Sequence, residues 1–480
     1  MTKRILLSIL LIFIISDIGY SFVQHLQMPL DGDMAESILP ANGYEKIFQD
    51  PFGISVITQN AIYPNPNRFF AQWTFATYFQ TFPFILQNFV NPIKSVYLSC
   101  AIAKISIQIG ILVLLGFFIT GARAIFKKEF LIAIALIIPL FQTNGYRSYM
   151  GIIDPSITYT FFYALPGALL LLFYLPFFDA SFHQKKFTTN KIGLVLLSLF
   201  AIFITFNGPL IPGAVLVTSL LYIVHHFKLN YFATKETSFV LRTFTTLKKI
   251  PKEHFFFFSF ISVLSLYSLY IGSNNSQFIH DKIAIYQRYL RLPEGLYYLL
   301  TQKIGYPLLL CMIGINAFLI NKNYKTPEGN KILNLLKWIG IFSILYIILL
   351  PLGGYRSYRP DIIRYDSIMP ITIALIFIYG LSAYFLIQNL KNKKRTIYLF
   401  VIISFSFIFT LADEPELGKN KGEMTALQKL ADSKENSVMM DDDCTIMAWK
   451  KIEEPNASES NARLIQYWGI TKEKKLYYQK

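Results

Sequence analysis

The chain has 480 residues, of which 54% are hydrophobic and only 15% are charged. Soluble domains contain about 25% charged residues, so this composition excludes a soluble enzyme, a disordered chain and a repeat solenoid, and it indicates a multi-span membrane protein. The formal net charge of +16 would suit a nucleic-acid partner. The placement of the basic residues along the chain, described below, explains most of that charge without nucleic acid.

Eleven segments carry few or no charges, and most reach the ~20 residues that a helix needs to cross a hydrocarbon core. The run at 130–144 is short and would need residues from its flanks. We therefore predict an all-α polytopic membrane protein with about eleven transmembrane helices. In chain order the segments are 5–22, 95–120, 130–144, 157–178, 192–207, 209–226, 255–273, 304–320, 338–352, 368–388 and 396–412.

The basic residues gather in alternate connections between these segments. If the N-terminus (Lys3 and Arg4) is cytoplasmic, the parts of the chain on its side contain 22 Lys and Arg, whereas the opposite connections contain 11 basic and 10 acidic residues. This asymmetry follows the positive-inside rule and predicts a cytoplasmic N-terminus and an external C-terminus. No small-x-small cleavage site follows 5–22, so we interpret this span as an uncleaved signal anchor.

One uncharged stretch, 69–93, has two interpretations. It is rich in Gln, Thr, Asn, Pro and aromatic residues, a mixture that suits the membrane interface. As a span it would invert the topology of everything that follows. We favour the interfacial interpretation, which leaves 23–94 as one long external loop.

The loop 23–94 is far longer than a connection needs, and long ordered loops are usually functional. It carries Asp31 and Asp33 on either side of Gly32, shortly after the first span. Residues i and i+2 of an extended chain point the same way, and glycine lets the backbone turn, so the two carboxylates can converge. Such a pair can act in general acid–base catalysis or bind a divalent cation (Mg²⁺ or Mn²⁺). The alternative is a solvated acidic turn.

A five-residue sequence, GYRSY, occurs twice, at 145–149 and 354–358, and both copies lie in predicted external loops. The first copy contains Arg147 and is followed by Asp154. Arg offers a planar fork to phosphate, so the two loops predict a phosphate or diphosphate site. Chance, together with the preference of Tyr and Arg for the membrane interface, is the alternative.

The second copy continues into RPDIIRYDSIMP, at the entrance to the span 368–388. Arg356, Arg359 and Arg364 stand close to Asp361 and Asp366 in this loop. These side chains could bind an anion at the mouth of a helix bundle, or they could pair with one another and pin the loop.

The three cysteines are scattered and indicate neither a disulfide framework nor a zinc site. Lys104 lies within the second span, where charged residues are costly and often functional. The tail, 413–480, predicts a small external α+β domain after the transmembrane domain 1–412. We expect a helix near 424–434 in this tail, followed by a hairpin over 437–451.

These features together resemble the GT-C superfamily of polytopic glycosyltransferases. The shared features are the cytoplasmic N-terminus, the early external loop with an acidic motif like DxD, about eleven spans and a small external C-terminal domain. Arg364 and Tyr365 in IIRYDSIMP are similar to the Arg-Tyr motif that leads into a late span in lipid-linked-sugar transferases. The residue matches are limited to Asp31 and Asp33 with Arg364 and Tyr365.

The resemblance implies transfer of a sugar from a polyprenyl-phosphate donor to a lipid, glycan or protein acceptor, with inversion at the anomeric carbon. Asp31 or Asp33 would act as the base. The same two carboxylates could also bind a divalent cation. Arg147, Asp154, Arg356, Arg359, Arg364 and Tyr365 would form the substrate site. The partners would be membrane lipids and the lipid-linked sugar, without nucleic acid.

The abundance of Phe, Tyr, Ile, Lys and Asn is typical of an A/T-rich bacterial coding sequence, which indicates the bacterial cytoplasmic (inner) membrane, with the C-terminus in the periplasm. Two other classes of protein fit a polytopic chain. A transporter or flippase should show interrupted helices and charges at the midplane. An O-antigen polymerase or ligase of envelope glycan assembly also uses external Arg-rich loops, but the early acidic loop favours the GT-C interpretation.

Overall fold

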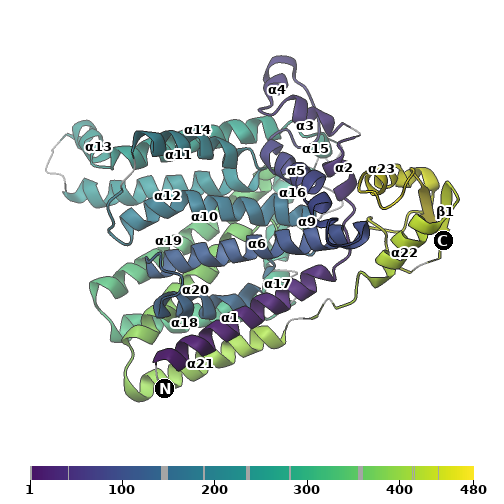
Figure 1. The fold of residues 1–480 in the computed structure, drawn as a ribbon. Coiled ribbons are helices and arrows are strands. Elements are labelled where there is room, and N and C mark those ends of the chain that lie inside the picture. Colours follow the sequence, from purple (N-terminus) through teal and green to yellow (C-terminus); the bar gives the residue numbers. More distant parts are fainter. Residues whose placement is uncertain are drawn as a thin grey trace. The chain divides into compact units, whose positions relative to one another are not determined.

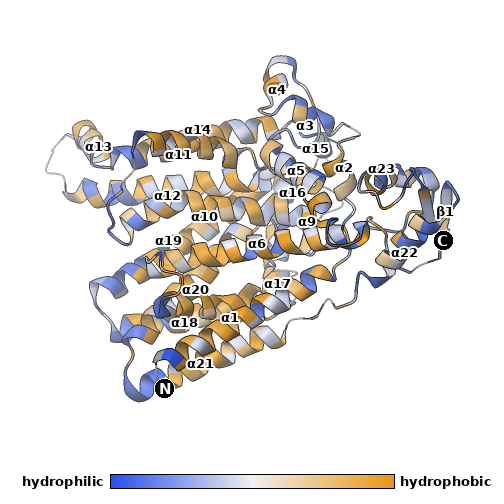
Figure 2. Ribbon diagram, in the orientation of Figure 1, coloured by the Kyte–Doolittle hydropathy of each residue, from blue (hydrophilic) through white to orange (hydrophobic). Residues whose placement is uncertain are grey.

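The computed structural model describes residues 3–41, 43–141, 150–187, 190–233, 238–279, 283–354, 361–412, 414–415, 417–441 and 443–480. Over these residues the chain is mostly helical (Figure 1). Nine helices among them are long and apolar enough to cross a membrane. Figure 2 shows apolar residues along the lengths of these helices. The chain is therefore a multi-pass helical membrane protein, in which each span satisfies its own backbone hydrogen bonds.

The nine spans follow one another along the chain with short helices between some of them. They are α1 (Lys3–Leu26), α6 (Pro92–Thr120), the continuous helix of α9 (Ile157–Tyr159), η2 (Thr160–Ala164) and α10 (Leu165–Ser181), α12 (Leu210–Ala233), α14 (Lys252–Gly272), α18 (Gly305–Asn323), α19 (Pro327–Leu349) with η3 (Leu350–Gly353), α20 (Met369–Asn389) and α21 (Asn392–Leu411).

Each of these nine helices coincides with one of the eleven predicted segments, and the two remaining segments are not among the nine. The segment 130–144 begins as α7 (Lys128–Ile137) and continues as the 3₁₀ turn η1 (Ile138–Phe141). The segment 192–207 is α11 (Lys191–Thr205), an apolar helix of 15 residues. A count of eleven spans is thus not confirmed by helix length alone.

Local sequence explains where α6 begins and ends. The Asn91 side chain accepts a hydrogen bond from the Lys94 amide at 2.9 Å, and Pro92 occupies the first turn, where its missing N–H costs nothing. At the other end Gly121 has a φ of 67°, the left-handed conformation that terminates many helices.

The predicted external loop 23–94 is largely helical. It contains α2 (Met34–Ile38), α3 (Glu45–Gln49), α4 (Ile54–Gln59) and α5 (Phe69–Leu86). The uncharged stretch 69–93 corresponds to α5, which is not among the nine spans. Its interfacial position stays a prediction.

The chain divides into two compact units. Unit 1 comprises Met1–Asp50, Ala71–Ala168 and Ala383–Lys480. Within it α1 packs against α6 and α7, and the C-terminal helix α22 (Lys421–Asp432) packs against α6. One apolar core joins α2, α5, α6 and the C-terminal segment, and it includes Met34, Phe75, Phe79, Val96, Leu430, Trp468 and Tyr477. The loop after α1 is therefore part of a packed core and not a loose connection.

Unit 2 comprises Pro51–Phe70 and Leu169–Ser382. In it α12 packs against α14 and α19, and α11 packs against α14. Asn65 and Asn275 hold the first-loop segment to the end of α14, because the Asn275 amide donates to Asn65 Oδ1 at 3.1 Å and the Asn65 backbone N–H donates to Asn275 Oδ1 at 3.2 Å. The shorter helices of this unit include α4, α13 (Phe239–Lys248), α15 (Ser276–Ile279), α16 (Ile285–Leu290) and α17 (Leu292–Thr301).

The C-terminal segment contains α22, β1 (Ser437–Met440), η4 (Pro455–Ser458), α23 (Glu459–Tyr467) and β2 (Leu476–Gln479). The helix expected near 424–434 is confirmed as α22. The expected hairpin over 437–451 is wrong, since β1 pairs in parallel with β2, with Val438 opposite Tyr477. Parallel strands need a long crossover, which η4 and α23 provide. The separation of 413–480 as a domain of its own stays a prediction.

Candidate functional site

The turn after α1 is built around the buried carboxylate of Asp31, which is 5% exposed. Its Oδ2 accepts hydrogen bonds from Ser156 Oγ at 2.8 Å and from the Thr158 amide at 3.0 Å. Its Oδ1 accepts from Thr158 Oγ1 at 2.8 Å and from the Asp33 amide at 3.0 Å. Ser156 also caps α9 by accepting from the Tyr159 amide. Asp31 therefore ties the turn to the beginning of α9.

The surroundings of Asp31 favour a structural role, in which its carboxylate stabilises the turn, over proton exchange with a substrate. Burial raises the pKa of the Asp31 carboxyl above its ordinary value, because the charged form loses its hydration. Hydrogen bonds from Thr158 and Ser156 oppose this rise, whereas the charge of Asp33 adds to it. Both oxygens already accept two protein hydrogen bonds each.

Asp33 is placed differently, although it lies only two residues further on. It is partly exposed and precedes α2 without capping it through its side chain. From the described residues its carboxylate accepts one hydrogen bond, from the Trp449 indole Nε1 to Oδ1 at 3.0 Å. Of the two predicted acids, Asp33 is the one that a substrate could reach.

The structure brings Asp154 to the same place as Asp31. Asp154 is buried, and its Oδ1 accepts a hydrogen bond from the Ser156 amide at 2.7 Å. The buried ammonium of Lys104 lies under this loop, where it donates to the Pro155 carbonyl and approaches Met28 Sδ at 3.3 Å. Asp154 and Lys104 therefore shape the loop from within and are not exposed for direct contact with a substrate.

A buried glutamate from the C-terminal segment completes the scaffold. Glu423 Oε2 accepts hydrogen bonds from the Leu30 amide at 2.8 Å and from the Tyr97 hydroxyl at 2.7 Å. Its Oε1 accepts from the Met447 amide at 2.8 Å. Burial raises the pKa of Glu423 from its ordinary 4.5 to about 7, against the effect of these three donors.

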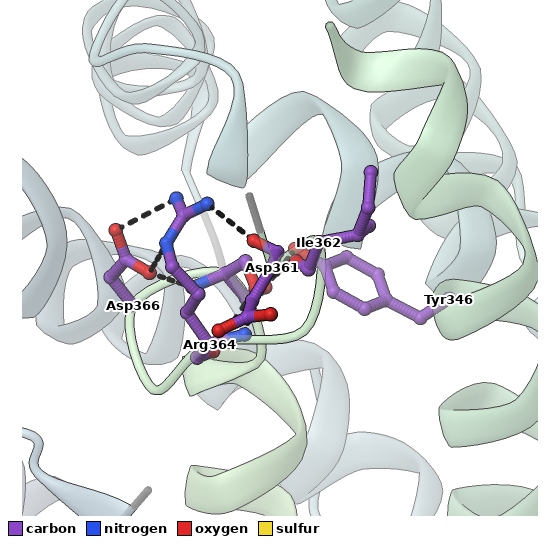
Figure 3. Close-up of polar contacts among 6 residues, drawn as sticks. Tyr346, Asp361, Ile362, Arg364 and Asp366 are labelled. Atoms are coloured by element: carbon purple, nitrogen blue, oxygen red, sulfur yellow. Dashed lines mark hydrogen bonds and ion pairs between the residues drawn. The ribbon is translucent and has the colours of Figure 1, made fainter. Parts of the chain in front are cut away.

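In unit 2, Arg364 is bound within its own loop (Figure 3). Its Nε and Nη2 atoms donate to the two oxygens of Asp366 at 3.0 and 3.1 Å, and its Nη1 atom donates to the Asp361 carbonyl at 2.9 Å. Asp366 is buried, while Arg364 and Tyr365 are partly exposed. The guanidinium fork is used inside the protein, which favours the loop-pinning interpretation of Arg364 over direct phosphate binding.

Ser367 completes the same turn. Its Oγ accepts from the Arg364 amide and donates to the Ile362 carbonyl, both at 2.9 Å. The Tyr346 hydroxyl of α19 donates to the Ser367 carbonyl at 3.1 Å. The loop that enters α20 is therefore fixed to the preceding span.

The other predicted substrate residues, Arg147, Arg356 and Arg359, lie outside the described residues, and so does most of the repeated GYRSY sequence. Their roles stay predictions. Asp31 and Asp33 lie in unit 1, and Arg364 and Tyr365 lie in unit 2.

The donor set does not fit a divalent cation held between Asp31 and Asp33. Within the described part of the chain, no group of three or more His, Cys, Asp or Glu side chains is arranged to hold a metal. A cation at Asp31 would have to displace hydrogen bonds from Ser156, Thr158 and the Asp33 amide.

Sequence reasoning did not identify Ser156, Thr158, Glu423 and Trp449 as parts of this site. Ser156 and Thr158 lie two and four residues after Asp154, so the position of this acid in the sequence could have pointed to them. Trp449 is an aromatic residue in a tail rich in charged residues, and this contrast could have pointed to it. Glu423 resembles other tail carboxylates in sequence, and only its burial distinguishes it.

Comparison with models of known protein families and with curated protein sequences finds no match for this chain. The fold and the site define a multi-pass helical membrane protein with a buried acidic scaffold and with the accessible carboxylate of Asp33 in the turn after its first span.

Proposed function

We propose that this protein is a glycosyltransferase that moves a sugar from a polyprenyl-phosphate donor to an acceptor hydroxyl at the external face of a bacterial cytoplasmic membrane. The observation that carries the proposal is the placement of Asp33. Its carboxylate is accessible, follows the first span directly and is held by a packed scaffold. A long apolar donor explains why such a carboxylate belongs to a protein with many spans.

In this reaction Asp33 takes the proton of the acceptor hydroxyl as its oxygen attacks the anomeric carbon. The bond between the anomeric carbon and the phosphate oxygen breaks, and its electron pair leaves with the polyprenyl phosphate. Attack from the face opposite the phosphate inverts the anomeric centre. Asp31 holds the turn that carries Asp33, through Ser156 and Thr158.

The leaving phosphate needs positive charge as the bond breaks. We assign this role to Arg147, Arg356 and Arg359, from their residue type and their position in predicted external loops. Arg364 shapes the loop that follows Arg359 through its bidentate contact with Asp366. Tyr365 lies in the same turn.

One observation favours a second function, that of a lipid flippase. Lys104 is a buried cation within the span α6, and charges inside spans often mark transport pathways. A flippase would move the lipid-linked sugar across the bilayer without breaking the sugar–phosphate bond.

The test is reconstitution of the purified protein into liposomes with polyprenyl-phosphate sugars radiolabelled in the sugar, together with an extract of envelope lipids and glycans as acceptors. A glycosyltransferase releases polyprenyl phosphate and moves the label to the acceptor fraction. Movement of the intact lipid-linked sugar between leaflets, with no label transferred, would replace this proposal with the flippase. Protein-free liposomes provide the background for both measurements.

A further inference from the structure

Trp449 is an exposed aromatic side chain at the accessible carboxylate. It is 56% exposed, although it belongs to a segment whose neighbours Ile446 and Met447 are buried. Its indole N–H points to Asp33 Oδ1. A large indole left open to solvent beside a carboxylate is a common way to bind a ligand that has both an apolar and a polar side.

Two contacts fix the position of the Trp449 ring, one with Tyr159 on a ring face and one with Gly32 at a ring edge. It stacks on Tyr159 with ring centroids 5.5 Å apart and an interplanar angle of 25°. A Cβ atom on Gly32 would lie 2.7 Å from Trp449 Cδ1 and 2.8 Å from the Trp449 backbone nitrogen. The glycine between the two aspartates is therefore required for the close approach of Trp449. With Tyr159 covering one ring face, the exposed area belongs to the rest of the indole.

The buried carboxylate of Glu423 positions the chain segments of both Asp33 and Trp449. Glu423 binds the amide of Leu30, three residues before Asp33, and the amide of Met447, two residues before Trp449. The Asn461 side chain donates to the Met447 carbonyl at 3.0 Å and fixes this peptide from its other side. Asp33 and Trp449 are 416 residues apart in sequence, yet both are set by the same short network.

From this arrangement we infer that Trp449 and Asp33 form the acceptor subsite and that the acceptor is a sugar ring. A pyranose has a face of C–H groups that can lie on an indole and a rim of hydroxyls that can donate to a carboxylate. Asp33 lies at the N–H edge of Trp449, so a sugar stacked on the ring places a hydroxyl at the base. The inference rests on the proposed function, and it narrows the acceptor to a glycan or glycolipid.

The same pair fits a quaternary ammonium group less well. Cationic ligands of this kind are usually bound by several aromatic rings that surround the charge. Here Tyr159 stacks on one face of Trp449 and does not form a second wall, so a cation would contact a single ring face. Choline therefore serves as the competing probe in the test.

The test measures binding of methyl glucoside, methyl galactoside and methyl mannoside to the full-length protein in lipid nanodiscs, by saturation-transfer NMR. Trp449→Ala should weaken binding of at least one glycoside about tenfold or more, because the stacking surface is lost. Trp449→Phe keeps a ring but loses the N–H donor to Asp33, and it should give an intermediate loss. Trp73→Ala, which removes another exposed tryptophan of unit 1, is the matched control and should bind as the unmodified protein does.

Gly32→Ala is a second route to the same result, since it displaces Trp449 without removing it. If Trp449→Ala does not give folded protein, Trp449→Phe and Gly32→Ala decide the question. Equal glycoside binding by the unmodified protein and these variants would overturn the inference, as would binding of choline in place of every glycoside.

Failure of the subsite and failure of the proposed function give different results. Glycoside binding needs no donor, so binding through Trp449 without any cleavage of donor would leave the subsite standing and remove the transferase. Sugar transfer with an unchanged acceptor KM in Trp449→Ala would keep the transferase and remove the subsite.

Discussion

At the scale of single residues, the two aspartates of one short motif have different environments. Asp31 accepts four protein hydrogen bonds, whereas the described residues supply one to the carboxylate of Asp33. Their sequence spacing predicted that both would lie together, and it did not separate their roles. The distinction comes from Ser156 and Thr158, which reach Asp31 from 125 and 127 residues away.

Asp31→Asn should destabilise the fold. In either orientation its amide group would face a backbone N–H, of Asp33 or of Thr158, and leave that donor unpaired. We expect a loss of about 1–3 kcal/mol in the free energy of unfolding. Denaturant or thermal unfolding in detergent measures it, with Asp443→Asn at an exposed position as the control. Equal stability of the two variants would mean that the Asp31 contacts contribute little.

Glu423 predicts a pH dependence of stability. Its pKa is raised from 4.5 to about 7 by burial, so the folded protein holds this proton more tightly than the unfolded chain does. The contribution to stability is full below about pH 4.5, falls as the pH rises through about 7 and then stays constant. Glu423→Gln should flatten this part of the profile of melting temperature against pH. If Glu423→Gln shows the same slope of melting temperature against pH as the unmodified protein, groups other than Glu423 cause the pH dependence of stability.

At the scale of elements, apolar length was a good guide to the spans, and cap residues such as Asn91 and Gly121 explain where α6 begins and ends. The difficult segments were those near the length limit, α7 and α11, because composition alone does not say whether a helix of 10 or 15 residues crosses a membrane. The predicted hairpin was wrong because the partner of β1 is β2, which lies beyond α23. Local alternation of residues carries no information about such a partner.

The parallel pairing leads to a prediction for the last strand. Removal of residues 476–480 deletes β2 and with it Tyr477, whose hydroxyl donates to the Ile446 carbonyl at 2.7 Å in the core of unit 1. Loss of a buried aromatic side chain alone costs about 3–5 kcal/mol. The truncated protein should therefore lose protease resistance in the segment after α21. Resistance equal to that of the full chain would contradict the β1–β2 pairing.

At the scale of the whole molecule, the two compact units divide the predicted long loop between them, at residues 50 and 51 and again at 70 and 71. The sequence placed the acidic motif directly after the first span, and the structure agrees. It did not place Trp449 or Glu423 beside that motif, because contacts over 416 and 393 residues leave no trace in spacing or periodicity.

The predicted topology concerns the entire chain. The described part of the chain has nine spans, or eleven if α7–η1 and α11 also cross the membrane. Both numbers are odd, so with α5 at the interface we expect the two termini on opposite sides of the membrane. Reporter fusions after Arg395 and after Lys480 should therefore report opposite sides, with the cytoplasm at Arg395. Reporters on the cytoplasmic side at both positions would place the Trp449–Asp33 pair away from an external donor.

The most direct test of the central claim is the rate of sugar transfer by Asp33→Asn under single-turnover conditions. The account predicts a rate lower by about 10²–10⁴, as expected for loss of a general base, with membrane insertion and melting temperature unchanged. Asp443→Asn, which removes a carboxylate from an exposed position of unit 1, should transfer at the unmodified rate. A transfer rate for Asp33→Asn equal to that of Asp443→Asn would contradict the assignment of Asp33 as the base.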